Sequence, residues 1–192
     1  MQKRTIVLAS SSPRRRELLE RAGVVFTVDP PNIEENMRRK LTVRELVKTL
    51  ALEKASEVAL RRKNAIVIGA DTIVSIGNYK WSKPENEEEA RRMLQTLSGK
   101  SHSVWTGFCI IDTKSGKRIQ RAVKTEVTVR VLSSQEIKRY IETGESLDGA
   151  GGYKMQGTGG FVIEKIHGDY TNVLGLPLSA VLDELKKMGI RA

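Results

Sequence analysis

The chain has 192 residues, of which 33 are Lys or Arg and 23 are Asp or Glu, so its formal net charge is +10. This length suits one α/β domain, and the basic balance favours an anionic partner such as a phosphorylated metabolite, a nucleic acid or a membrane surface. A single cysteine, Cys109, excludes an intramolecular disulfide and a multi-cysteine zinc site. No apolar run is long enough for a signal peptide or a membrane span, so we expect a cytoplasmic protein.

Hydrophobic periodicity predicts an early βα alternation followed by a strand-rich second half. In chain order, we expect a strand (3–9), a helix (14–22), a strand (24–28), a connector (30–40), a helix (42–63), a strand (65–70, continued over 73–76), a helix (87–97), three strands (101–112, 117–123 and 124–132), a helix (135–143), a glycine-rich loop (149–160), a strand (161–166) and a helix (177–188). This order predicts an α/β fold with a mixed twisted sheet and flanking helices, forming two lobes around a cleft within a single domain, 1–192.

The segment Ser10-Ser11-Ser12-Pro13-Arg14-Arg15-Arg16 follows the first strand and opens the first helix. Ser12 is a suitable N-cap and Pro13 a suitable first helical residue. Basic residues in a first turn oppose the helix dipole, so three arginines there are easier to explain if an anion binds. A capped, solvated basic turn is the alternative.

Asp71 stands where the apolar strand 65–70 ends, within Gly69-Ala70-Asp71-Thr72. A buried carboxylate is costly unless it is paired or metal-bound, so we expect a general base or a metal ligand, with a turn-forming Asp as the alternative. The pair Glu34-Glu35 reads as solvated surface by itself. If it lies near Asp71, it could complete a magnesium site together with substrate phosphates.

Three other features are weaker signals. Lys54 and Lys83 are not singled out by spacing, since most lysines face solvent. The glycine-rich loop carries Gln156, whose amide could read a base edge, although a flexible loop explains the glycines equally well. His102 and His167 are expected to be structural.

Eight segments together resemble the Maf family of nucleotide pyrophosphatases over nearly the whole chain: LASSSPRRRELLERAG, IEEN, LALEKA, GADTIV, KPENEEEA, LSGKSHSVWTG, GYKMQGTGG and GDYTNVLGLPL. The resemblance implies an ITPase-like fold and metal-assisted hydrolysis of nucleoside triphosphates between the α- and β-phosphates, with Mg²⁺ or Mn²⁺. The Tyr-x-x-Gln-Gly pattern resembles the dTTP/UTP branch, and the family commonly forms homodimers.

The resemblance also implies a role for individual residues. Asp71 is the expected general base, and Glu35 with Asp71 the expected metal ligands. The expected phosphate-binding residues are Ser10, Arg14, Arg15, Lys54 and Lys83. Substrate choice is expected to depend on Arg14, Thr72 and Gln156. The chain departs from the pattern at Trp81-Ser82, where the indole could stack on a base, and at Lys154, where the ammonium could add phosphate affinity.

Two alternatives are carried forward. One is a house-cleaning pyrophosphatase for ITP or XTP on the same fold. The other is a nucleic-acid-binding or cell-division regulatory protein, in which the basic surface contacts a polyanion. The low aromatic content, 5%, and the lack of a helix-turn-helix pattern make the second less well supported.

Overall fold

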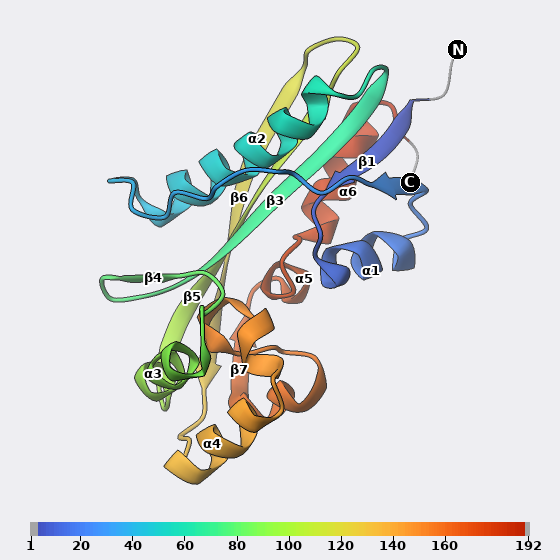
Figure 1. The fold of residues 1–192 in the computed structure, drawn as a ribbon. Coiled ribbons are helices and arrows are strands. Elements are labelled where there is room, and N and C mark those ends of the chain that lie inside the picture. Colours follow the sequence, from blue (N-terminus) through green and yellow to red (C-terminus); the bar gives the residue numbers. More distant parts are fainter. Residues whose placement is uncertain (1–3, 191–192) are drawn as a thin grey trace. The chain divides into compact units, whose positions relative to one another are not determined.

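The structure, a computed structural model, describes residues 4–190 (Figure 1). The strands are β1 (Thr5–Ala9), β2 (Phe26–Val28), β3 (Ala65–Ile76), β4 (Tyr79–Trp81), β5 (Ser101–Asp112), β6 (Arg118–Val129) and β7 (Ile163–His167). The helices are α1 (Pro13–Arg21), α2 (Val43–Leu60), α3 (Glu87–Leu97), α4 (Ser134–Glu142), α5 (Tyr170–Val173) and α6 (Leu178–Lys187). Three short 3-10 turns lie between α4 and β7: η1 (Glu145–Asp148), η2 (Ala150–Gly152) and η3 (Gly157–Val162).

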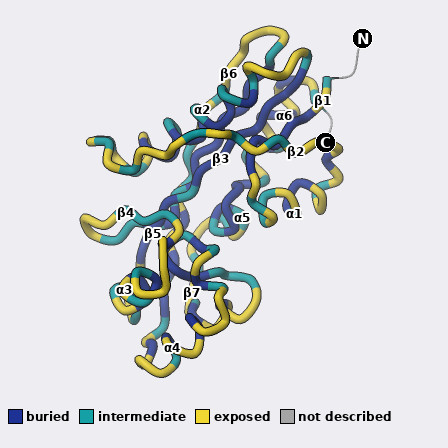
Figure 2. The backbone as a smooth tube through the Cα atoms, viewed as in Figure 1, coloured by how far each residue is buried: buried dark blue, intermediate teal, exposed yellow. Residues whose placement is uncertain are grey.

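The strands form one mixed sheet with the order β2-β1-β3-β5-β6-β7, and β4 pairs with β3. Strand β1 runs parallel to both β2 and β3, whereas β3 with β4 and β6 with β7 are antiparallel. Strands β3 and β5 are mostly buried along their length, and the connecting loops are largely exposed (Figure 2). The mixed α/β fold with flanking helices that we expected is therefore confirmed.

The chain divides into two compact units. Unit 1 takes the described residues of 1–71, 106–123 and 175–192, and unit 2 takes 72–105 and 124–174. In unit 1, helix α2 packs closely on β1, β3 and β5 through mostly small side chains: Val7, Ala9, Ala51, Ala55, Val58, Ala65, Val67, Cys109 and Ile111. A Cβ added at Gly107 would lie 2.2 Å from the carbonyl oxygen of Val47, and one at Gly69 would lie 2.6 Å from that of Ala51. Glycine is therefore required where α2 crosses these strands.

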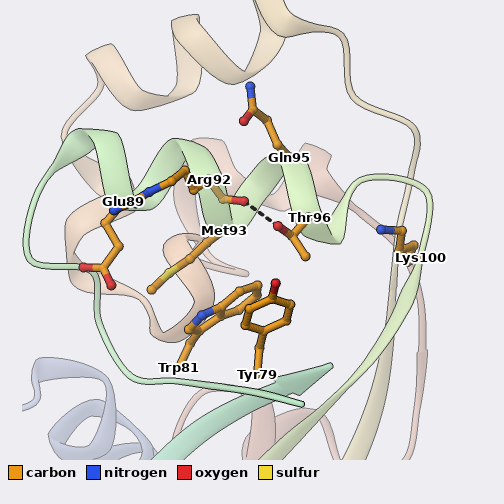
Figure 3. Close-up of a pocket in the computed structure, with 8 residues that line it drawn as sticks. All are labelled: Tyr79, Trp81, Glu89, Arg92, Met93, Gln95, Thr96 and Lys100. Atoms are coloured by element: carbon orange, nitrogen blue, oxygen red, sulfur yellow. Dashed lines mark hydrogen bonds between the residues drawn. The ribbon is translucent and has the colours of Figure 1, made fainter. Parts of the chain in front are cut away.

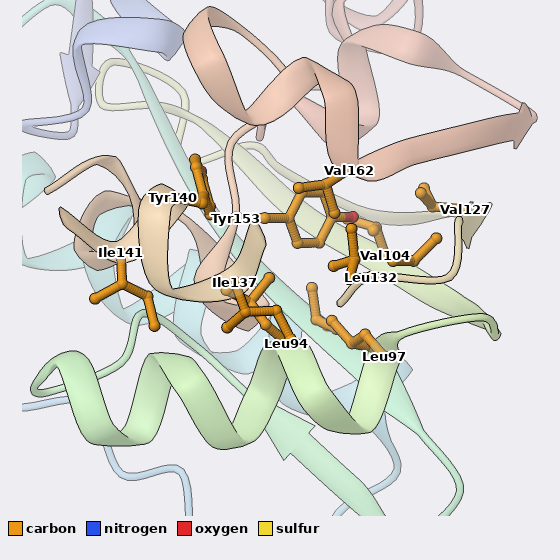
Figure 4. Packing of buried hydrophobic residues seen from close by; sticks show 12 residues of the cluster. Leu94, Leu97, Val104, Val127, Leu132, Ile137, Tyr140, Ile141, Tyr153 and Val162 are labelled. Atoms are coloured by element: carbon orange, nitrogen blue, oxygen red, sulfur yellow. The ribbon is translucent and has the colours of Figure 1, made fainter. Parts of the chain in front are cut away.

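Unit 2 has its own hydrophobic core, built where α3 and α4 meet the ends of β3, β5 and β6 (Figure 4). Leu94 and Leu97 from α3 pack with Ile137, Tyr140 and Ile141 from α4. Both helices begin at side-chain caps, Asn86 for α3 and the Ser133–Glu136 capping box for α4. A fixed start and a continuous apolar face together hold these helices on the sheet.

The structure corrects three of the predicted boundaries. Over residues 117–132 the structure has one strand, β6 (Arg118–Val129), and not two, because backbone pairing with β7 continues the strand up to Val129. Strand β3 runs through Asp71 without ending there. The sequence analysis did not predict β4 or α5, which are only three and four residues long. Cys109 is buried, and burial raises the pKa of its thiol to about 12.

No helix within residues 4–190 combines the length and the apolar character needed to cross a bilayer.

We predict that Gly107→Ala destabilises the protein by about 3 kcal/mol, because the new methyl group has to push α2 away from β5. The measurement is the free energy of unfolding in urea. The control is Gly160→Ala, an exposed site where the nearest atom to the added Cβ is 3.3 Å away and a loss below about 1 kcal/mol is expected. Equal losses in the two variants would contradict the close packing of α2.

Candidate functional site

The loop between β1 and α1 is organised around the hydroxyl of Ser10, which is buried. Its Oγ accepts hydrogen bonds from the backbone N–H of Ser12 at 3.2 Å and from Nη1 of Arg15 at 3.0 Å. Arg15 Nε donates to the carbonyl oxygen of Gly175 at 2.8 Å, so a residue far along the chain orients this guanidinium. Burial lowers the pKa of Arg15, and the negative charge of Asp71 opposes that shift.

The three consecutive arginines do not behave alike. Arg14 and Arg15 are half-buried, whereas Arg16 is exposed and pairs with Glu20 one turn along α1 at 2.8 Å. Ser12 occupies the N-cap position of α1, but its side chain makes no capping hydrogen bond. Two of the three guanidiniums therefore remain candidates for binding an anion at this helix start.

The central cluster of unit 1 consists of Lys54, Asp71 and Glu35. Lys54, from α2, is only 8% exposed, and Asp71, in the middle of β3, is 4% exposed. The ammonium of Lys54 donates to Oδ1 of Asp71 at 2.5 Å and lies 2.7 Å from Oε1 of Glu35. The structure thus brings together three residues that the sequence predicted separately, because Lys54 contacts both carboxylates. Glu35 is exposed, as is Glu34 beside it.

The second oxygen of Asp71 differs from the first, which Lys54 satisfies. Oδ2 is buried and accepts no hydrogen bond from the described residues. Burial raises the pKa of Asp71, and the charge of Glu35 raises it further, while the ammonium of Lys54 opposes both effects. Burying a carboxylate with an unsatisfied oxygen lowers the stability of a fold, so such groups are rare in general. Carboxylates with a raised pKa are common in catalytic sites.

No group of three His, Cys, Asp or Glu side chains converges on a possible metal position within residues 4–190. The carboxylates of Asp71 and Glu35 nevertheless fit Mg²⁺ or Mn²⁺, because such ions are commonly held by one or two carboxylates together with substrate phosphates. The unpartnered Oδ2 of Asp71 is a hard oxygen donor of the required kind. The ammonium of Lys54 already demonstrates that both carboxylates can share one cation.

The remaining candidate residues belong to unit 2. Lys83 Nζ pairs with Oδ1 of Asp148 at 2.6 Å. Thr72 and Gln156 are half-buried, and Gln156 immediately precedes η3. The carbonyl oxygen of Ser82 accepts from the backbone N–H of Gly151 at 3.0 Å, which joins the Lys83 segment to the glycine-rich loop.

The glycine-rich loop is fixed by residues that the sequence analysis did not connect. The hydroxyl of Tyr153 lies 2.8 Å from Nε2 of His102, and both side chains are buried. The hydroxyl of Tyr140 accepts from the backbone N–H of Lys154 at 2.9 Å. Burial lowers the pKa of His102 to about 4, so this ring is neutral and structural, as expected. The pairing of His102 with Tyr153 spans 51 residues, and no local pattern could reveal it.

Trp81 lies on the face of its neighbour Tyr79, with ring centroids 5.2 Å apart and ring planes 23° from parallel. Both rings face helix α3 and line a pocket of about 600 Å³ with Met93, Thr96 and Lys100 (Figure 3). Tyr79 therefore covers one face of the Trp81 indole, the ring that we expected to stack on a base.

Comparisons with known proteins agree over nearly the whole chain. The family described as Maf-like protein matches residues 5–188. A dTTP/UTP pyrophosphatase of Desulforamulus reducens is 46% identical over 187 residues, which cover 97% of this chain and 98% of that relative. A dTTP/UTP pyrophosphatase of Dictyoglomus thermophilum is 45% identical over 189 residues, covering 97% of each chain.

Among solved structures, a nucleoside-triphosphatase / dITP/XTP pyrophosphatase from Mycobacterium abscessus matches with a TM-score of 0.42 and 11% identity, covering 74% of this chain and 96% of that one. The sequence relatives are far more similar and match almost end to end. On the family match over residues 5–188 and these relatives, the chain belongs to the Maf-like protein family.

Proposed function

We propose that this protein hydrolyses dTTP and UTP to the nucleoside monophosphate and pyrophosphate. The observation that carries the proposal is the contact of Lys54 with both Asp71 and Glu35, in which Lys54 and Asp71 are buried and Oδ2 of Asp71 accepts no hydrogen bond from the described residues. The relatives named dTTP/UTP pyrophosphatase, 45–46% identical, support the substrate class. The proposed catalytic unit is the single domain 1–192, acting as a cytoplasmic homodimer.

In this proposal, Asp71 is the general base. It accepts a proton from the attacking water, whose oxygen forms a bond to the α-phosphorus. The bond between the α-phosphorus and the bridging oxygen breaks, and pyrophosphate leaves with the bonding electron pair. The raised pKa of Asp71 suits this role, because a base works best when its pKa lies nearer the working pH than that of an ordinary Asp.

The positively charged groups have a separate task. A triphosphate carries several negative charges, and the proposed ligands for its phosphates are Ser10, Arg14, Arg15, Lys54 and Lys83. The fork of Arg15 is suited to this role because Ser10 and Gly175 already fix its orientation, so little side-chain entropy remains to be lost on binding. Arg14, Thr72 and Gln156 are proposed to determine which nucleotide is preferred.

Glu35 and Asp71 are the proposed ligands of the divalent cation. Because a carboxylate bonded to such a cation is a poor base, Asp71 acts mainly in one of its two proposed roles, as base or as metal ligand. Such an ion supplies charge neutralisation for the phosphate oxygens. Lys54 contacts both carboxylates when no cation is bound. In the proposed complex, the cation replaces Lys54 as the partner of Glu35, and the ammonium of Lys54 then pairs with the substrate. The contact between Lys54 and Asp71 orients the carboxylate in either case.

We predict that the purified protein with Mg²⁺ releases pyrophosphate from dTTP and UTP, measured by a coupled pyrophosphate assay. Asp71→Asn is expected to lower kcat by about 10²–10⁴ because the amide cannot accept the proton of water. Asp183→Asn, the same change at an exposed position of unit 1, is the control and should leave kcat unaltered.

The same assay separates the alternatives. Faster turnover of ITP than of dTTP or UTP would favour the alternative function, a house-cleaning pyrophosphatase for ITP or XTP. No turnover of any triphosphate, with steeply salt-dependent binding to arbitrary DNA, would favour the nucleic-acid reading. Full activity in Asp71→Asn would exclude Asp71 as the base.

We predict that Lys54→Met moves the acid limb of the pH profile of kcat/KM to higher pH. A base must be deprotonated to act, so activity falls as the pH drops through its pKa, and the ammonium of Lys54 holds the pKa of Asp71 down. Without that charge, the pKa rises and the loss of activity begins at a higher pH. Lys54→Arg keeps the charge and should keep the limb in place. An unmoved limb in Lys54→Met would show that another group titrates.

We predict that Gln156→Glu shifts the preference from UTP towards CTP. An amide can donate to the keto oxygen of uracil, whereas a carboxylate only accepts and instead suits the amino group of cytosine. The measurement is the ratio of kcat/KM for UTP to that for CTP, expected to fall about tenfold or more. Gln135→Glu, at an exposed position of α4, is the matched control. An unchanged ratio would mean that Gln156 does not contact the base.

A further inference from the structure

Two lysines of unit 2 converge on one carboxylate. Lys83 Nζ lies 2.6 Å from Oδ1 of Asp148, and Lys154 Nζ lies 3.6 Å from Oδ2 of the same side chain. Lys154 is the less accessible of the two, with 24% of its side chain exposed against 54% for Lys83. Each ammonium therefore faces a different oxygen of a single anionic group.

The backbone beneath Lys154 is held by the core of unit 2. Its N–H donates to the hydroxyl of Tyr140, which is 2% exposed, and the preceding Tyr153 is bonded through its own hydroxyl to His102. Gly149 makes this arrangement possible, because a Cβ there would lie 1.8 Å from the carbonyl oxygen of Tyr153. The ammonium of Lys154 is thus carried on a preorganised segment, unlike a lysine on a free loop.

The segment that carries Lys83 is tied to the same loop through the hydrogen bond from Gly151 N–H to the Ser82 carbonyl oxygen, 3.0 Å. Asp148 ends the turn η1, whose first residue, Glu145, accepts from the N–H groups of Thr158 at 3.2 Å and Gly159 at 3.1 Å. Lys83, Lys154 and Asp148 therefore lie on backbone segments of unit 2 that hydrogen bonds hold in place.

We infer that Lys83 and Lys154 form one anion site for the phosphate groups of the nucleotide, in which Asp148 is the resident counter-ion that the phosphate displaces. The inference rests on the proposed function and adds Lys154 and Asp148 to it. A phosphate group, like a carboxylate, presents two anionic oxygens to two donors, and it carries more charge. Ion pairs as exposed as these are weak, so the exchange of partners costs little.

This assignment gives Asp148 and Lys154 opposite effects on affinity. Lys154 contributes a charge-assisted contact to the bound phosphate. Asp148 competes with the phosphate for both lysines before binding and repels it afterwards. A purely structural ion pair would behave differently, because breaking it from either side would disturb the loop in the same direction.

The test is the Kd of the α,β-methylene analogue of dTTP, which cannot be cleaved between the α- and β-phosphates, measured by titration calorimetry on the full chain with Mg²⁺. Lys154→Met should weaken binding about threefold to tenfold. Asp148→Asn should tighten binding by about twofold to fivefold, and by less when Lys154→Met is also present. The controls are Lys165→Met and Glu164→Gln, the same charge changes at exposed positions of β7, with no expected effect beyond twofold.

Weaker binding in Asp148→Asn, or a Kd in Lys154→Met no different from that in Lys165→Met, would overturn the inference. Turnover of dTTP by the unsubstituted chain distinguishes this failure from that of the proposed function. If the unsubstituted chain hydrolyses dTTP while Lys154→Met binds normally, only the two-lysine site is wrong. If it hydrolyses no triphosphate, the proposed function itself fails.

Discussion

The buried contact between Lys54 and Asp71 is the constraint on which the rest of unit 1 depends. A carboxylate in the middle of a buried strand is costly unless an opposite charge reaches it. Lys54 reaches Asp71 because α2 lies almost against the backbone of β3, a distance that only Gly69 and the small residues Ala51 and Ala55 allow. The close packing of a helix on the sheet is therefore also what neutralises the central carboxylate of the site.

The ion pair with Lys54 satisfies only one of the two oxygens of Asp71. Lys54 satisfies one oxygen of Asp71, while burial and the neighbouring Glu35 raise the pKa of the same carboxyl. The remaining oxygen has no partner within the described residues. A core optimised for stability alone would bury an apolar residue here, so the polar cluster supports the proposed role of Asp71 in chemistry on an anionic substrate. Membership of the Maf-like protein family supports the same conclusion.

In unit 2, the main constraint is the conformation of the glycine-rich loop, which several side chains hold in place. Two tyrosines contribute: the hydroxyl of Tyr153 is hydrogen-bonded to His102, and the hydroxyl of Tyr140 accepts a hydrogen bond from the backbone N–H of Lys154. Glu145 secures the next turn through two backbone N–H groups, which help to keep the pKa of its carboxyl below the usual value although burial opposes the shift. The loop can therefore present Lys154 and Gln156 from a fixed backbone despite its glycines.

The sequence by itself determined most elements and the mixed sheet, and it marked Asp71 as a candidate site residue, because periodicity and the placement of a charge after an apolar run are local signals. Tertiary structure alone decided that Lys54 is buried, that one strand replaces two over 118–129, and that Asp148 joins two lysines. Each of these depends on partners distant in sequence. A side chain's environment is set by whichever elements pack around it, and no local pattern encodes those partners.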